Sequence, residues 1–182
     1  LIGPGLGSLS DTKNAIRSMI REVSIAKKNL VVDADAISCL ADQQHLIKDL
    51  SCVITPHAQE FFKLTGERLA TDLESMKSQV SEWAKKFNAT IFLKGPTDVI
   101  SNGEITRLNT IHNPAMTVGG TGDVLAGIIA ALLSKQVSSI TAGRIAAFLN
   151  GEAGNKAFQK LSYGLTASDI IEYIPRVLNA YV

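Results

Sequence analysis

A glycine-rich loop that runs into an apolar segment is the part of this sequence best suited to chemistry. Gly119, Gly120, Thr121 and Gly122 are followed by Asp123 and by the apolar residues 124–133. Because so many glycines disfavour a strand or helix interior, we expect a loop that opens a helix. The unpaired N–H groups and the dipole of a helix start attract an anion, and glycines let a ligand approach the backbone. The pattern therefore predicts an anion site with a carboxylate beside it.

The same loop also has a purely structural interpretation. Short glycine motifs occur by chance in many proteins. An acidic residue in the first turn of a helix is also favourable without any ligand. On this second interpretation, Asp123 caps a tight turn before a buried helix.

Two carboxylates follow a short apolar strand predicted at Leu30–Val32. Ligands of open α/β sheets bind beyond the carboxyl ends of the strands. Asp33 is nearest the strand and is the better functional candidate. Asp35 could equally cap a helix over residues 36–40.

A histidine and a glutamate follow the next predicted strand, Cys52–Ile54. His57 and Glu60 fall on one helical turn at the strand exit, so both can face the same edge of the sheet. A histidine in this position is commonly a surface or capping residue. Its neighbouring glutamate, at a further strand exit, favours a functional role.

A lysine follows the buried strand predicted at Thr90–Leu93. A solvated lysine has no structural reason to follow such a strand, so we expect Lys94 to face a phosphate or a nucleotide. The next residues, 98–101 and 104–108, predict a β-hairpin with a tight Asn102-Gly103 turn.

Apolar stripes at helical spacing predict the helices that hold these strands. The small residues of the helix that starts at Ser138 or Ser139 favour close approach, to a neighbouring helix or to a flat ligand such as a purine. The other predicted features are a helix capped by Ser10 with Met19 on its apolar face, a helix capped by Asp72, and a last helix that starts with a capping box at Thr166–Asp169 and stops at Pro175.

The bulk properties indicate one domain with a sizeable core, since the chain has 182 residues and 46% hydrophobic content. The net charge of +1, with no long run of either sign, gives no indication of a nucleic-acid or acidic-membrane partner. The longest apolar run, 124–133, is shorter than the roughly 20 residues of a membrane helix. Cys39 and Cys52 are predicted to be buried thiols in a reducing cytoplasm, with a disulfide as the alternative.

The first residues, Leu-Ile-Gly-Pro-Gly, include no Met and do not have the pattern of a signal peptide. We interpret them as the end of a strand that enters the glycine turn Gly3–Gly7. We therefore expect further sequence before Leu1.

Strands that alternate with helices predict an α/β fold, with a mostly parallel sheet and helices on both faces, in one domain over residues 1–182. Such a sheet brings the polar loops together at one edge. An anion-binding helix start beside a carboxylate and a lysine suits phosphoryl transfer. Asp123 would take the proton of a substrate hydroxyl while the glycine-loop amides hold the phosphoryl group. A P-loop enzyme is disfavoured because the G-x-x-x-x-G-K-[ST] motif is absent from the sequence.

Seven ordered blocks extend over essentially the whole chain and together resemble one enzyme family. They are GPGLG (3–7), DADAI (33–37), TPHAQE (55–60), LKGPTDVIS (93–101), GGTGDVLAGIIAALL (119–133), NGEAGNKA (150–157) and GLTASDIIEYIP (164–175). The set resembles the nucleotide-dependent NAD(P)H-hydrate dehydratases of the ribokinase-like superfamily. The resemblance implies the ribokinase-like three-layer α/β/α fold.

The resemblance also implies a lyase of metabolite repair. In that family ADP (prokaryotes) or ATP (eukaryotes) drives the dehydration of hydrated NADH or NADPH back to NAD(P)H. The chemistry proposed for the family is phosphorylation of the hydroxyl at carbon six of the reduced ring, followed by elimination of phosphate, with Mg²⁺ present. A homo-oligomer is expected on the same basis, and the two predicted buried thiols indicate a cytoplasmic location.

Site residues carry over by position in the matching blocks. The resemblance implies that Gly5, His57 and Asp123 contact the hydrated dinucleotide. Glu60 matches the glutamate of the superfamily's magnesium network and would act through water. The adenine nucleotide would contact Lys94, Gly95, Pro96, Thr97, Asp98 and Gly122.

The sequence departs from the family pattern in three places. Relatives often read K-G-x-x-T, whereas here Thr97 comes one position early and Asp98 takes its place. Met116-Thr117-Val118 replaces the frequent Met-Ala-Thr before the glycines. Relatives usually carry on the order of 90 further residues before GPGLG, since a complete domain of this type commonly exceeds about 200 residues.

Two other functions fit the same residues. A kinase of the same fold, acting on a small hydroxylated metabolite or vitamin precursor, would use similar machinery, and the fold alone does not separate the two. A non-catalytic nucleotide-binding module would need only the glycine loop. The presence of Asp123, Lys94 and Glu60 together argues against that module.

Overall fold

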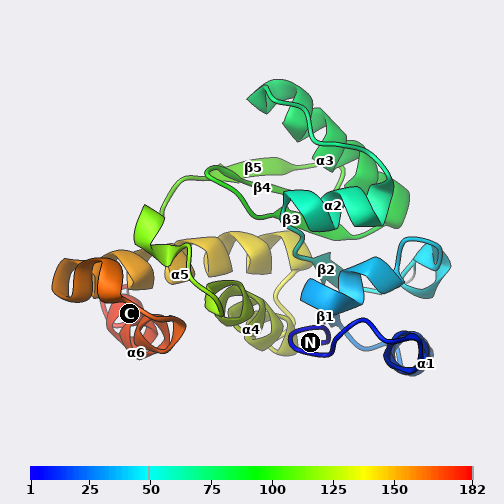
Figure 1. Cartoon of the computed structure of the whole chain (residues 1–182), viewed down its shortest axis with the longest axis horizontal. Coiled ribbons are helices and arrows are strands. Elements are labelled where there is room, and N and C mark those ends of the chain that lie inside the picture. The colour runs from blue at the N-terminus through cyan, green and yellow to red at the C-terminus, as the bar shows by residue number, and fades with distance from the viewer. Residues whose placement is uncertain (49, 182) are drawn as a thin grey trace.

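A five-stranded sheet lies at the centre of the computed structural model, which describes residues 1–48 and 50–181 (Figure 1). The strands β1, β2 and β3 pair in parallel, and β4 is antiparallel to both β3 and β5. Only β4 therefore runs against the others. Along the sheet, the strands are β1 (Leu30–Val32), β2 (Cys52–Ile54), β3 (Thr90–Leu93), β4 (Asp98–Ser101) and β5 (Thr106–Asn109).

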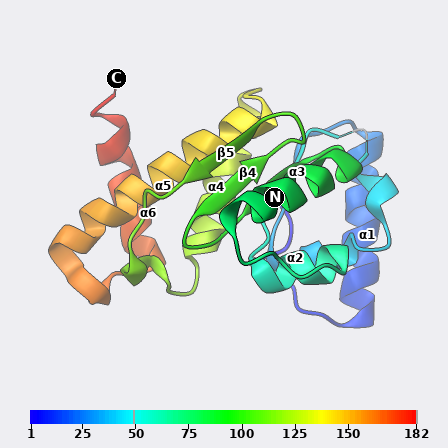
Figure 2. The same cartoon turned by 90° about the horizontal axis from the view of Figure 1, so that it is seen from above.

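Helices cover both faces of this sheet (Figures 1 and 2). The principal helices are α1 (Ser10–Ile25), α2 (Ala58–Thr65), α3 (Leu73–Phe87), α4 (Thr121–Ser134), α5 (Ser139–Leu161) and α6 (Ala167–Leu178). Short 3₁₀ helices lie at η1 (Ala34–Cys39), η2 (Gln44–Leu46), η3 (Pro114–Met116) and η4 (Ser162–Gly164). The predicted three-layer α/β/α fold is confirmed.

Strands β1, β2 and β3 are buried on both sides, because successive side chains point to opposite faces and each face packs against helices, whereas Arg107 and Leu108 of the edge strand β5 are exposed. Val32 and Ile54 lie in a core that includes side chains of α1, α2 and α3. Val31, Val53 and Phe92 lie in a second core with side chains of α4 and α5. A third cluster joins α4 and α5 to α6. The sheet is thereby held rigidly, which fixes the loops at its edge.

Several predicted helix ends are confirmed. The Asp72 side chain accepts a hydrogen bond of 2.8 Å from Ser75 N at the start of α3. Gly66 ends α2 in the left-handed conformation that glycine favours. Thr166 and Asp169 form the predicted capping box of α6. These ends depend on local chemistry, which is why the sequence is sufficient to predict them.

The last helix does not stop at Pro175, as the sequence predicts, but continues to Leu178. Proline removes one backbone donor from the helix. The extra turn places Val177 in the third cluster, and Arg176 lies over the Tyr173 ring at 4.7 Å. Tertiary packing of this turn outweighs the local cost of the proline.

The predicted hairpin is present, but the prediction of a tight two-residue turn is wrong. β4 ends at Ser101 and β5 begins at Thr106, so residues 102–105 form the connection. The Asn102 carbonyl Oδ1 accepts hydrogen bonds from Glu104 N at 3.1 Å and from Ile105 N at 2.8 Å. This side chain stabilises a longer loop in place of the tight turn.

The first helix and the segment after β1 also differ from expectation. Leu9 is the N-cap of α1, with Ser10 inside the helix, and Met19 is 56% exposed where the stripe predicts burial. Residues 34–39 form η1 in place of a helix over 36–40, and Asp33 at its N-cap makes no capping hydrogen bond. The Asp35 carboxylate accepts a bond of 2.7 Å from Gly7 N, so it holds the glycine turn.

Both cysteines are buried free thiols, as predicted. Burial raises the pKa of Cys52 to about 12 and also raises the pKa of Cys39. Roughly one Cys52 thiol in 10⁴ is then ionised at pH 8, and only the thiolate reacts. We expect iodoacetamide at pH 8 to label neither cysteine in the native protein and both in denaturant, as measured by mass spectrometry. Rapid native labelling of Cys39 would show that η1 opens readily.

None of the helices in the described part of the chain combines the length and apolar character that a membrane crossing requires.

Candidate active site

The polar loops predicted from the sequence meet at one edge of the sheet. Strands β1, β2, β3 and β5 all end there, because β4 reverses the chain and β5 returns to the direction of β3. Ile2 pairs with Val32 in a parallel bridge, so the turn Gly3–Gly7 leaves the sheet at the same edge. The structure therefore places five connections together where open α/β sheets bind ligands.

The glycine loop opens α4 at this edge. Gly120 is the N-cap residue and has a φ of 91°, a left-handed conformation that suits glycine. The Thr121 hydroxyl donates to Met116 O at 2.9 Å, which fixes the loop to η3. Asp123 lies exposed in the first turn. The N-cap is therefore Gly120, and Asp123 occupies the first turn, where a carboxylate is favourable to the helix dipole as in the structural interpretation.

Lys94 joins the helix start to the strand ends. Its Nζ lies 2.8 Å from the Asp33 carboxylate and 3.8 Å from that of Glu60. A β-carbon added to Gly122 would meet Lys94 Nζ at 3.4 Å, so the ammonium group lies directly beside the α4 backbone. The functional prediction for Lys94 named a phosphate partner; in the structure its ammonium group also neutralises a buried carboxylate.

Asp33 lies beneath this lysine, fully enclosed. Asp33 is 1% exposed, and its Oδ1 also accepts a hydrogen bond of 2.7 Å from the Thr55 hydroxyl. Asp33 Oδ2 is buried without a hydrogen-bond partner among the described residues. Asp33 is thus placed to orient Lys94, not to contact a ligand itself.

His57 and Glu60 form a capping box at the start of α2. His57 Nδ1 accepts a hydrogen bond of 3.1 Å from Gln59 N and one of 3.3 Å from Glu60 N. In return, Glu60 Oε2 accepts a hydrogen bond of 2.8 Å from His57 N. This geometry leaves the hydrogen of a neutral imidazole on Nε2. The structural role that the sequence left open for His57 is therefore present. Its half-exposed ring also lines the cleft described below.

The loop from Lys94 to Asp98 is held in place by its own end. The Asp98 carboxylate accepts a hydrogen bond of 3.1 Å from Gly95 N and one of 2.9 Å from Asn109 Nδ2. Burial raises the pKa of Asp98, and these hydrogen bonds partly oppose that change. The His112 ring also bonds to the carbonyl of Pro96 at 3.0 Å. The carboxylate at position 98 therefore ties the loop to β5.

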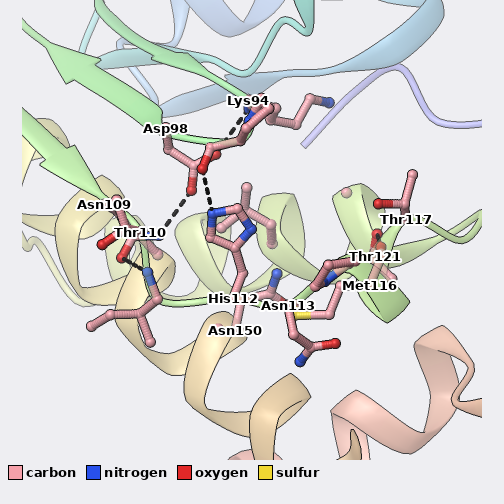
Figure 3. Close-up of a pocket in the computed structure, with 18 of the residues that line it drawn as sticks. Lys94, Asp98, Asn109, Thr110, His112, Asn113, Met116, Thr117, Thr121 and Asn150 are labelled. Carbon is pink, nitrogen blue, oxygen red and sulfur yellow. Dashed lines mark hydrogen bonds between the residues drawn. The ribbon is translucent and has the colours of Figure 1, made fainter. Parts of the chain in front are cut away.

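An open cleft of about 950 Å³ connects these groups (Figure 3). Lys94 and Asp98 lie above it in the view, Asn109 and Thr110 on one side, and Thr117 and Thr121 on the other. Of the predicted site residues, His57, Lys94, Gly95, Pro96, Asp98, Thr121 and Gly122 line the cleft. The other five do not line it: Gly5 and Asp123 are exposed, and Glu60, Thr97 and Gly120 are half-buried.

Sequence reasoning missed the wall formed by Asn109–Asn113, and for the wall at Asn150 and Gly151 of α5 it gave only two alternatives, close packing on a helix or contact with a flat ligand. One signal was available. A hairpin after a parallel strand returns the chain to the edge where that strand ends, so residues after β5 must lie near Lys94. The contribution of α5 depends on tertiary packing, and the sequence carries only its run of small residues.

Gly151 lets the chain after β5 pack directly on α5. A β-carbon at this position would lie 1.7 Å from the Ile111 carbonyl oxygen, so Gly151→Ala must displace that segment. We expect unfolding free energy to fall by about 1–3 kcal/mol, as for an overpacked core. The nucleotide Kd should rise severalfold.

The matched control is Gly127→Ala in α4, where an added β-carbon meets nothing within 4 Å. That change should raise helix stability by up to about 1 kcal/mol. Denaturant titration and calorimetry measure both variants. Equal behaviour of the two would show that the Ile111 contact does not hold the cleft wall.

Comparison with known proteins gives a consistent result. The family model for NAD(P)H-hydrate dehydratase matches residues 1–176. A bifunctional NAD(P)H-hydrate repair enzyme from Pyrobaculum aerophilum is 43% identical over 180 residues, which are 99% of this chain and 35% of that protein. An ADP-dependent (S)-NAD(P)H-hydrate dehydratase from Cenarchaeum symbiosum is 38% identical over 97% of this chain and 61% of its own length.

A solved structure agrees with the sequence matches. The Bacillus subtilis ADP/ATP-dependent NAD(P)H-hydrate dehydratase, co-crystallised with ATP/Mg²⁺, superposes with a TM-score of 0.85 at 29% identity, over 100% of this chain and 64% of that one. The chain thus spans about a third of the bifunctional relative and about three fifths of the single-function one. Since the family model matches nearly the whole chain, this protein belongs to the NAD(P)H-hydrate dehydratase family.

Proposed function

We propose that the protein is a lyase that uses ADP or ATP to dehydrate hydrated NADH or NADPH back to the reduced cofactor. The observation that carries this proposal is that the N-terminal end of α4 lies beside Lys94, with the exposed carboxylate of Asp123 in the first turn of the helix. Family membership and the ADP-dependent name of a 38% identical relative support the same activity. Residues 1–182 would act as one nucleotide-binding catalytic domain.

The cleft is the proposed nucleotide site. Lys94 uses one donor on Asp33, so further N–H groups remain for phosphate oxygens. Gly95, Pro96, Thr97 and Asp98 would support the nucleotide mainly through the loop backbone, because the Asp98 carboxylate already binds Gly95 and Asn109. Gly122 would place its N–H at the phosphates.

Asp123 is the proposed general base. Its exposed carboxylate lies in the first turn of α4, close in sequence to the N–H groups of Gly120, Thr121 and Gly122. In the proposed reaction, Asp123 removes the proton of the ring hydroxyl, whose oxygen attacks the terminal phosphorus of the nucleotide. The amides hold the transferring phosphoryl group. Loss of the new phosphate group as inorganic phosphate, together with a proton from the adjacent ring carbon, then restores the ring double bond.

The hydrated dinucleotide would contact Asp123, Gly5 and His57. His57 can donate from Nε2, because Nδ1 is engaged by the start of α2. Gly5 lies exposed with a φ of 70°, in the turn held by Asp35 and Gly7. A side chain at position 5 would be strained in this conformation and would shield the turn from a ligand.

The residues fit a magnesium ion held through water and phosphate. Glu60 Oε2 already accepts from His57 N and lies 3.8 Å from Lys94, while its carboxylate retains free lone pairs. Mg²⁺ commonly keeps several waters and binds one or two carboxylates plus phosphates. Glu60 would hold such water molecules, and the ion would neutralise charge on the nucleotide phosphates.

Product analysis distinguishes this activity from that of a kinase with the same fold. Incubation with hydrated NADH, ADP or ATP and Mg²⁺ is followed by ³¹P nuclear magnetic resonance. A dehydratase releases inorganic phosphate and leaves no lasting phosphate ester. A stable phosphomonoester on a small hydroxylated metabolite, without turnover of the hydrate, would establish the kinase instead.

A homo-oligomer remains a prediction from the family resemblance, and a cytoplasmic location remains a prediction from the two buried thiols. Light scattering of the purified protein measures the first, and fractionation of cells measures the second. A monodisperse monomer would contradict the predicted assembly without affecting the proposed chemistry.

A further inference from the structure

A second cavity lies between the edge strand β5 and helix α5. Its volume of about 410 Å³ is within the range of small-molecule sites. β5 is the last strand of the described sheet, and Figure 2 shows it alongside α5. The lining comes from β4, β5, the segment after β5 and α5, and it includes none of the site residues predicted from the sequence. The cavity is therefore distinct from the proposed nucleotide site.

Two arginines from different elements line this cavity. Arg107 on β5 pairs with Ile100 on β4, so its side chain lies on the sheet face that packs against α5. Arg144 lies on α5 with Thr141 and Phe148, at helical spacing that places all three on one face. Two guanidinium groups therefore border one hollow in the surface.

Neither guanidinium group has a carboxylate partner among the described residues, whose ion pairs all involve other side chains. Arg107 Nη1 donates a hydrogen bond of 3.0 Å to Thr106 O. This bond uses one of the five N–H donors of the group. Arg144 is exposed. Two positive charges are therefore available to an anion.

Most of the remaining lining is apolar. It includes buried Ile100 and Ala147, half-buried Phe148, and Leu108 and Ile145, which are 42% and 36% exposed. Exposed aliphatic side chains in a hollow gain free energy when a ligand covers them. The cavity thus combines two cationic groups with apolar surface, which suits an organic anion better than a bare inorganic ion.

A structural role explains only part of this arrangement. Charge on an edge strand prevents the strand from pairing with the sheet of another molecule, and Arg107 lies on such a strand. Arg144 lies instead on a helix that already packs against the sheet, so it has no edge to protect. Edge protection also gives no reason for a hollow with apolar walls. A ligand accounts for all three features.

We propose that this cavity binds a phosphomonoester with an apolar body, whose phosphate accepts hydrogen bonds from Arg107 and Arg144. A phosphomonoester carries a charge of about −1.5 to −2 at pH 7, which matches two guanidinium groups, whereas a carboxylate carries only one charge. The planar donors of arginine bind phosphate oxygens in pairs. The inference does not depend on the proposed function, because the two sites are separate.

The test titrates the isotope-labelled protein with naphthyl phosphate and follows the amide signals by nuclear magnetic resonance. Signals of residues 106–109 and 141–148, which surround the cavity, should shift and saturate. Naphthol lacks the phosphate and inorganic phosphate lacks the rings, so each should bind at least about tenfold more weakly. Equal binding of either compound, or of singly charged naphthoate, would overturn the proposed ligand class.

Two substitutions test the arginines directly. Arg107→Gln and Arg144→Gln should each raise the Kd of naphthyl phosphate by about tenfold or more, the usual loss for a hydrogen bond to a charged group. Both residues are exposed, so the Tm should stay close to that of the wild type. Arg21→Gln, an exposed position on α1 away from the cavity, should leave the Kd unchanged. An unchanged Kd in either cavity variant would overturn the proposal.

Saturating ADP distinguishes this cavity from the cleft, where a phosphate would bind beside Lys94. Displacement of naphthyl phosphate by ADP, or shifts confined to amides 119–123, would place the probe in the cleft and overturn the proposal. Shifts at β5 and α5 that persist with ADP would support it. A protein that binds the probe there but binds neither ADP nor the hydrated cofactor would support this inference and count against the proposed function.

Discussion

Asp123→Asn should lower turnover of the hydrated cofactor by about 10²- to 10⁴-fold, the usual contribution of a positioned general base. The substitution keeps the size of the side chain but removes its ability to accept the proton of the hydroxyl. The loop amides and Lys94 remain, so the Kd of ADP or ATP should change by less than about threefold. Steady-state kinetics and calorimetry measure the two effects on the same samples.

The control for this prediction is Glu74→Gln. Glu74 is an exposed carboxylate in the first turn of α3 and lies outside the cleft. Both substitutions remove a favourable interaction with a helix dipole, worth about 0.3–1 kcal/mol. If the two variants lost activity equally, a loss of stability would explain both. Turnover of Asp123→Asn close to that of the wild type would remove Asp123 from the proposed mechanism.

Lys94→Met should lower the unfolding free energy by about 3 kcal/mol in addition to weakening nucleotide binding. The Asp33 carboxylate is 1% exposed in the wild type, and among the described residues the substitution leaves it with the Thr55 hydroxyl as its one hydrogen-bond partner. Breaking one side of a buried ion pair commonly costs 3–5 kcal/mol, because the remaining charge is uncompensated. The lower figure applies here because Lys94 itself is partly exposed.

Two further variants test this explanation. Asp33→Asn in the Lys94→Met background removes the unpaired charge and should recover most of the lost stability, but not nucleotide affinity. Lys77→Met breaks a pair of the same 2.8 Å length on the surface of α3 and should cost at most about 1 kcal/mol. Denaturant unfolding of all four proteins gives the comparison. Similar losses for Lys94→Met and Lys77→Met would contradict the buried-pair account.

The elements that local chemistry determines could be predicted from the sequence. The buried strands, the Asp72 cap and the Gly66 end follow from periodicity and from residues with one dominant conformational use. The glycine loop predicted over residues 119–122 ends earlier than expected, because Thr121 and Gly122 already lie in α4. The convergence of Lys94, Asp33 and the α4 start at one edge follows from strand alternation alone. The roles of Asp123, Gly5 and the loop 94–98 remain predictions.

Features that depend on contacts between distant residues could not be predicted. The pairing of Lys94 with Asp33 joins side chains 61 positions apart, and it changes the expected effect of a lysine substitution from binding alone to stability as well. The last turn of α6 persists beyond Pro175 because Val177 is buried by other helices. The cavity that Arg107 and Arg144 line is likewise visible only when β5 and α5 are in place.

The most direct measurement of the central claim follows the absorbance of reduced nicotinamide in a solution of hydrated NADH, Mg²⁺ and the purified protein. Addition of ADP or ATP should restore the absorbance, with one phosphate released per cofactor recovered, and Asp123→Asn should slow the recovery by about 10²- to 10⁴-fold. A nucleotide that binds in the cleft without any recovery of absorbance would contradict the dehydratase assignment and direct the search to other hydroxylated substrates.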